Sequence, residues 1–103
     1  MELLPDELRS RLPPLLSQEA ADEPVVYARY FLPGTRRNWY VIEGEPEDGD
    51  FLFFGFVTGI ADEFGQFRLS EPLSITGPSG QAVESDPNFK EGKLTDVVPA
   101  PDL

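Results

Sequence analysis

The sequence contains neither cysteine nor histidine, and these two absences close most routes to catalysis. Without cysteine the chain has no disulfide, no thiolate nucleophile and no zinc–thiolate site. Without histidine it lacks the residue that most often serves as general base or metal ligand. Hydroxyl groups such as that of Ser70 therefore have no usual base to activate them. The composition favours a protein that is not an enzyme and needs no cofactor, while leaving carboxylate chemistry open.

Basic residues are also scarce: the chain has eight Lys and Arg but nineteen Asp and Glu, which gives a formal net charge of −11. Nucleic acids and anionic membranes are bound through surface Lys and Arg, so the composition argues against both as direct partners. The expected partner is a basic protein. No apolar run approaches the ~18 residues of a membrane span, and the N-terminal residues do not resemble a signal peptide, so we expect a cytoplasmic protein.

The pattern of apolar residues predicts one α+β domain over residues 1–95, followed by a frayed C-terminal tail, residues 96–103. Leucines recurring every three to four residues predict a short helix from Pro5 to Leu12, ended by the two prolines that follow. Strands are expected at 25–32, 38–43, 50–57 and 63–70. Their short connections favour an antiparallel meander of about four strands, with the helix packed on one face. The residues from 75 onward are expected to be mostly irregular, with Phe89 as an anchor.

The third expected strand is apolar on both faces. One face carries Phe51, Phe53 and Val57, and the opposite face carries Leu52, Phe54 and Phe56. Such a strand is normally central and covered on both sides. Gly55 interrupts it, which predicts a bulge or a close approach by another part of the chain.

A cluster of acidic residues in "IEGEPEDGD", residues 42–50, precedes that strand. Its five carboxylates are Glu43, Glu45, Glu47, Asp48 and Asp50. Because Gly44, Pro46 and Gly49 favour a turn, the plainest interpretation is a solvated hairpin tip. The spacing does not match an EF-hand, although a looser calcium or magnesium site stays open. So does a glycosidase-like pair, if Glu43 and Asp50 face each other across the hairpin.

Further acids fall at other expected strand ends, as Asp22, Glu23, Asp62, Glu63 and Glu71. If these loops gather at one edge of the sheet, their charges form a negative field that speeds association with a basic partner. We assign no catalytic or metal-binding residue. The candidate partner-binding surface consists of Glu43, Glu45, Glu47, Asp48, Asp50, Asp62 and Glu63.

Three segments together resemble a bacterial family known as domain of unknown function 2958. They are "LLPDELRSRLPPL", "NWYVIEGEPEDGDFLFFGFVTG" and "EFGQFRLSEPLSITGP", in this order and spacing. The chain departs from the family pattern at Pro72, where a leucine is usual, and in a shorter tail. The resemblance implies a genomic setting on plasmids, integrative elements and phages, sometimes near antirestriction genes, and implies no activity.

Two hypotheses of different classes follow. The first is a non-enzymatic interaction protein of mobile genetic elements that blocks a basic, nucleic-acid-handling host defence protein of the restriction or CRISPR type. The second is a small domain or enzyme that uses carboxylates to bind a ligand or a divalent metal. Binding of the first kind should weaken with salt and need no metal, whereas a metal site should lose stability when a chelator is added.

Overall fold

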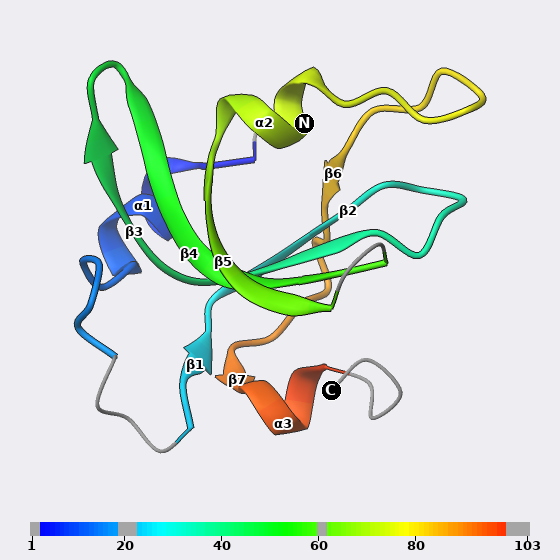
Figure 1. The fold of residues 1–103 in the computed structure, drawn as a ribbon. Coiled ribbons are helices and arrows are strands. Elements are labelled where there is room, and N and C mark those ends of the chain that lie inside the picture. The colour runs from blue at the N-terminus through cyan, green and yellow to red at the C-terminus, as the bar shows by residue number, and fades with distance from the viewer. Residues whose placement is uncertain (1–2, 19–22, 60–61, 99–103) are drawn as a thin grey trace.

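The computed structural model describes residues 3–18, 23–59 and 62–98, which form three helices and seven strands (Figure 1). The helices are α1 (Asp6–Arg11), α2 (Ser70–Ser74) and α3 (Leu94–Val97). The strands are β1 (Val25–Val26), β2 (Ala28–Phe31), β3 (Asn38–Glu47), β4 (Asp50–Thr58), β5 (Glu63–Arg68), β6 (Glu84–Ser85) and β7 (Gly92–Lys93). In these ranges no helix has the length and apolar character needed to cross a membrane.

The main sheet is antiparallel, with the strand order β5-β4-β3-β2-β6. Strands β2 to β5 form the expected meander, and α1 confirms the predicted helix, so the α+β class is confirmed. The fifth strand, β6, comes from the region expected to be irregular. Its pairing with β2 continues beyond the strand, because the Asp86 N–H donates to the Arg29 carbonyl at 3.0 Å.

The first expected strand, 25–32, is in fact divided between two sheets. Val25 and Val26 form β1, which pairs with β7, whereas Ala28–Phe31 forms β2 of the main sheet. The break is at Tyr27, whose N–H donates to the Val41 carbonyl at 2.8 Å. A continuous apolar run does not reveal such a change of partner, because both halves keep strand geometry.

Strand β4 lies between β3 and β5, and it is covered on both faces as predicted. Phe51 and Phe53 belong to one hydrophobic cluster, together with Leu8 and Leu12 from the region of α1. Phe56 belongs to a second cluster on the opposite face, with Tyr40, Ile42, Val26, Leu94 and Val98. The two clusters make β4 the centre of the fold.

Gly55 marks a close approach, as expected, because a Cβ at this position would lie 2.1 Å from the Tyr40 carbonyl oxygen. The accompanying bulge is on the neighbouring strand, where the β3–β4 register shifts between Val41 and Glu43. A β-bulge bends its strand and increases the local twist. The bulge therefore lies directly before the acidic half of β3.

The C-terminal region is more ordered than the sequence indicates. Helix α3 extends past the expected domain boundary at residue 95, and Leu94 and Val98 are both buried. Leu94, Val97 and Val98 have the spacing of one helical face, but one turn is too short to stand out as a pattern. Phe89 packs against the second cluster, as the predicted anchor. The remaining residues of the expected tail, 99–103, lie outside the described residues.

Candidate functional site

The acidic stretch is mostly strand. Strand β3 continues to Glu47 and β4 begins at Asp50, so only Asp48 and Gly49 form the turn, both at positive φ (44° and 80°). This geometry is typical of a two-residue hairpin. The prediction that Gly44 and Pro46 belong to the turn was wrong. The Gly44 N–H points away from β4 to the Pro13 carbonyl, and Pro46 faces the same edge, where a missing N–H removes no bond to β4.

Glu43 is buried inside the molecule, with only 3% of its surface exposed. Its Oε1 accepts a hydrogen bond from the Leu16 N–H at 2.8 Å, and its Oε2 accepts one from the Gln18 N–H at 2.6 Å. Glu45, two residues along β3, accepts the Leu15 N–H at 2.9 Å. The assignment of Glu43 to the acidic surface was therefore wrong, because this carboxylate is consumed in holding residues 15–18 against β3.

Gln18 completes this attachment, and the sequence reasoning missed it. Its Nε2 donates to the carbonyls of Val25 and Ile42 at 3.2 and 3.1 Å, and its Oε1 accepts the Val25 N–H at 2.8 Å. One amide side chain thus bonds to two strands at once. The residue stands in a polar stretch that reads as an ordinary loop, so only its partners, all seven or more residues away, reveal its role.

Glu47 and Asp50 flank the turn and bond to the last residue of β5 and the first residue of α2, respectively. The Arg68 Nε donates to Glu47 Oε1 at 2.7 Å. Asp50 Oδ2 accepts the Ser70 hydroxyl at 2.6 Å, while Oδ1 accepts the Phe51 N–H at 2.8 Å. The Ser70 hydroxyl, followed by the Phe51 N–H, lowers the pKa of Asp50 below its ordinary value.

The glycosidase-like pair does not form. Asp50 is opposite Glu47 in the hairpin, whereas Glu43 is opposite Phe54 and its carboxylate is bonded to residues 16 and 18. Nor do the carboxylates gather around a cation, since the described part of the chain has no group of three or more that could hold a metal ion.

The remaining candidates, Asp48, Asp62 and Glu63, are exposed. Asp62 accepts the Gly59 N–H at 3.0 Å, and Glu63 opens β5 opposite Val57. Asp48 lies at the other end of β4, in the β3–β4 turn. The structure therefore places the exposed acids at both ends of the β4–β5 pair and does not gather them in one loop cluster. Asp22, also considered, is outside the described residues.

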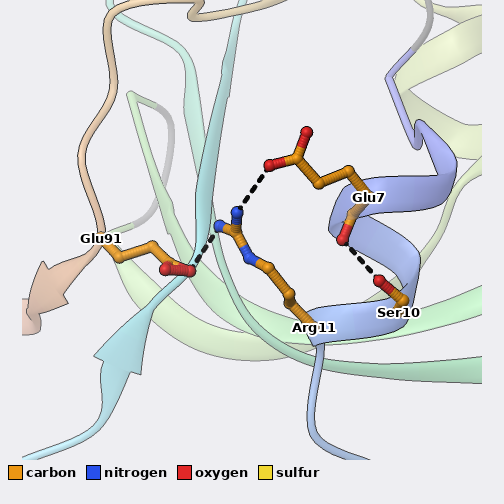
Figure 2. A network of polar contacts seen from close by, with 4 residues as sticks. All are labelled: Glu7, Ser10, Arg11 and Glu91. Atoms are coloured by element: carbon orange, nitrogen blue, oxygen red, sulfur yellow. Dashed lines mark hydrogen bonds and ion pairs between the residues drawn. The ribbon is translucent and has the colours of Figure 1, made fainter.

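Five guanidinium groups contact carboxylates or aromatic rings within the fold, and Figure 2 shows one of them. Arg11 bonds Glu7 at 3.1 Å and also Glu91, so it ties α1 to the segment before β7 (Figure 2). Arg68 bonds Glu47, and Arg29 bonds Asp86 at 3.0 Å. Two more, Arg9 and Arg37, lie over the rings of Phe51 and Trp39. These five arginines thus bond carboxylates or pack on aromatic rings, while acids such as Asp48, Glu63 and Glu71 are exposed.

An open groove of about 510 Å³ lies beside β2 and β3, lined by residues that include Arg29, Asn38, Tyr40, Asp86 and Phe89. Three of its polar side chains bond one another. Arg29 Nε donates to Asn38 Oδ1 at 2.8 Å, and Arg29 Nη1 donates to Asp86 Oδ2 at 3.0 Å. A ligand would have to displace these contacts, which does not favour a binding or catalytic role for the groove.

Comparisons with known proteins identify a family and no individual relative. Neither curated proteins nor solved structures give a match. A protein family described as "Protein of unknown function (DUF2958)" matches residues 3–98 of the 103-residue chain, which includes every helix and strand described above. The match covers α1, the acidic hairpin and β5, the segments on which the sequence resemblance depends. The chain therefore belongs to this family.

Proposed function

We propose that the protein is a small, non-enzymatic interaction protein of mobile genetic elements that binds a basic, nucleic-acid-handling protein of host defence and blocks it. The observation that carries the proposal is the charge balance of the surface. Five arginines bond carboxylates or cover aromatic rings of the same chain, while Asp48, Glu63 and Glu71 are exposed, in a chain of net charge −11.

A surface of this kind acts mainly on the encounter between two proteins. A field of one sign raises the association rate of an oppositely charged partner and fixes its orientation. A protein that binds nucleic acid carries a basic surface shaped for phosphates, and an acidic protein competes for that surface. The exposed carboxylates at both ends of β4 and β5 would span such a surface better than a single loop tip would.

The test compares two variants that each remove three negative charges. The first is Asp48→Asn, Glu63→Gln and Glu71→Gln; the matched control is Asp6→Asn, Glu84→Gln and Asp96→Asn, which are also exposed but belong to other segments. Each immobilised protein is incubated with host lysate at low ionic strength, and the captured proteins are identified and then tested as purified nucleases. We expect the wild type and the control to capture and inhibit the same basic protein, and the first variant to bind it more slowly.

Inhibition should decline steeply as salt is added, because exposed charges are screened. Equal binding by the first variant and its control would contradict a role for these three carboxylates. A fall in the melting temperature on addition of a chelator would instead support the hypothesis of a carboxylate–metal site.

A further inference from the structure

We propose that the outer edge of β5 binds an extended, basic segment of the partner as an additional strand of the main sheet. This inference rests on the proposed function and specifies how the partner is held. Strand β5 is the last strand of the order β5-β4-β3-β2-β6, and within residues 3–18, 23–59 and 62–98 β4 is its only neighbour in the sheet. An edge strand offers a row of unpaired N–H and C=O groups, on which another chain can form backbone hydrogen bonds.

The orientation of the peptide groups follows from one hydrogen bond. The Leu69 N–H donates to the Phe51 carbonyl at 2.9 Å and continues the β4–β5 register. Alternate residues of an antiparallel strand direct their peptide groups to opposite edges. Residues 63, 65 and 67 therefore point toward β4, whereas the peptide groups of Phe64, Gln66 and Arg68 point outward.

These three outward peptide groups have no backbone partner among the described residues. Gln66 and Arg68, two of the three residues, are exposed. Edge strands are usually protected by charged side chains, especially lysine, by proline or by a bulge. The strand sequence "EFGQFR" has no proline or lysine, its two charged residues are at its ends, and its register with β4 is unbroken. The described residues therefore leave the outward peptide groups of β5 available to an added strand.

An exposed aromatic ring accompanies this edge. Phe64 is 49% exposed, the most of any phenylalanine in the described ranges. Its ring stacks on Phe54 with centroids 5.9 Å apart and meets Phe56 edge-on at 5.0 Å. Because both neighbours lie on the central strand β4, the ring is held in place before any partner arrives. An apolar side chain of an added strand would cover it with little further loss of conformational freedom.

The charges indicate what kind of strand fits. On one face of β5, Phe64 favours apolar side chains, and Arg68 disfavours basic ones. The other face carries Glu63 and the buried Phe67; Asp62 precedes the strand and Glu71 follows it, and all three acids are exposed. The complementary segment alternates apolar and basic residues. A second copy of this chain, itself at −11, would bring acids against acids, so the partner's basic segment is the favoured occupant.

The test uses a fluorescent peptide of alternating lysine and valine as the probe, with a glutamate–valine peptide as the control for charge. Two variants of the whole chain are compared. Gln66→Pro removes an outward N–H and leaves the bonds to β4 intact, whereas Gln66→Ala keeps that N–H. We expect the lysine–valine peptide to bind the wild type and Gln66→Ala alike, and to bind Gln66→Pro roughly tenfold more weakly or worse. The glutamate–valine peptide should not bind.

Amide hydrogen exchange on the wild type makes the test independent of whether Gln66→Pro folds. Bound peptide should slow exchange at Phe64, Gln66 and Arg68 and leave Gly65 and Phe67, already turned toward β4, unchanged. Equal peptide binding by the two Gln66 variants, or slowing elsewhere only, would overturn the proposal. If, in the absence of peptide, amide exchange at these residues slows as the protein concentration is raised, the proposal is also overturned, because a second copy of the chain then occupies the edge.

The failure of this inference can be distinguished from failure of the proposed function. Suppose that Gln66→Pro binds the lysine–valine peptide as the wild type does, while the variant lacking the charges of Asp48, Glu63 and Glu71 binds the basic host protein more slowly. The role of the acidic surface is then supported, and strand addition at β5 is contradicted. If the peptide binds at the β5 edge but the triple charge variant captures the host protein as the wild type does, strand addition is supported and the role of the acidic surface is contradicted.

Discussion

Replacing Glu43 with Gln tests whether its carboxylate holds residues 15–18 against the sheet. The change keeps the length of the side chain but exchanges one oxygen for an NH₂ group. The amide oxygen can still accept from Leu16 or from Gln18, but the NH₂ group then faces the other N–H, which is also a donor. One N–H of these two part-buried hydrogen bonds loses its partner, and the remaining bond loses the assistance of a full negative charge.

The expected cost follows from these two losses. An unsatisfied buried donor costs about 1–3 kcal/mol, and hydrogen bonds to charged groups contribute about 1.5–3 kcal/mol, against about 0.5–1.5 kcal/mol for neutral ones. We therefore expect Glu43→Gln to lower the free energy of unfolding by roughly 2–4 kcal/mol. In a domain of this size that lowers the melting temperature by roughly 10–20 °C.

Glu45→Gln is the matched control, since it removes the same charge from the same strand. Glu45 accepts only the Leu15 N–H among the backbone donors described, and it is half-buried, so an amide oxygen can replace it. Its cost should stay below about 1 kcal/mol. Urea unfolding can be followed by the fluorescence of Trp39, the single tryptophan, which is 3% exposed. The carboxylate of Glu43 would not hold residues 15–18 if the two variants lost equal free energy of unfolding, or if Glu43→Gln lost less than about 1 kcal/mol.

Three further predictions concern the core and the hairpin. Phe53→Ala should cost about 3–5 kcal/mol in urea unfolding, because the ring is fully buried and packs on Phe51 and Phe67; a cost below about 1 kcal/mol would mean that β4 is not the core. Gly55→Ala should destabilise by roughly 1–3 kcal/mol because its Cβ meets the Tyr40 carbonyl, whereas Gly65→Ala, with open space around it, should be tolerated in the same assay; similar costs would contradict the close approach. The pKa of Asp50 is lower in the folded protein than its ordinary value of 3.8, so the ionised carboxylate stabilises the fold above that pH, and this stabilisation is lost as pH falls through the folded pKa. The melting temperature of the wild type should therefore exceed that of Asp50→Asn at neutral pH and lose this advantage below about pH 4. A difference in melting temperature that does not change with pH would contradict the prediction.

Local patterns in the sequence determined the main elements of the fold. The leucine spacing predicts α1, and the two-sided apolar pattern of residues 50–57 places β4 at the centre of the sheet. Gly55 indicates the close approach of another part of the chain. These features are readable because hydrophobic periodicity and glycine geometry depend on a few neighbouring residues. The acidic excess is readable for the same reason, since net charge is a sum over the composition.

Only the tertiary structure decided what each carboxylate does. Glu43 and Asp48 belong to the same short acidic stretch. Glu43 is buried and accepts hydrogen bonds from N–H groups 25 and 27 residues away, whereas Asp48 is exposed at the turn. The split of residues 25–32 between two sheets and the addition of β6 likewise depend on pairing with distant segments. A carboxylate is a surface charge or a buried acceptor according to which N–H groups the fold brings to it, and this long-range pairing leaves no mark in the local pattern of residues.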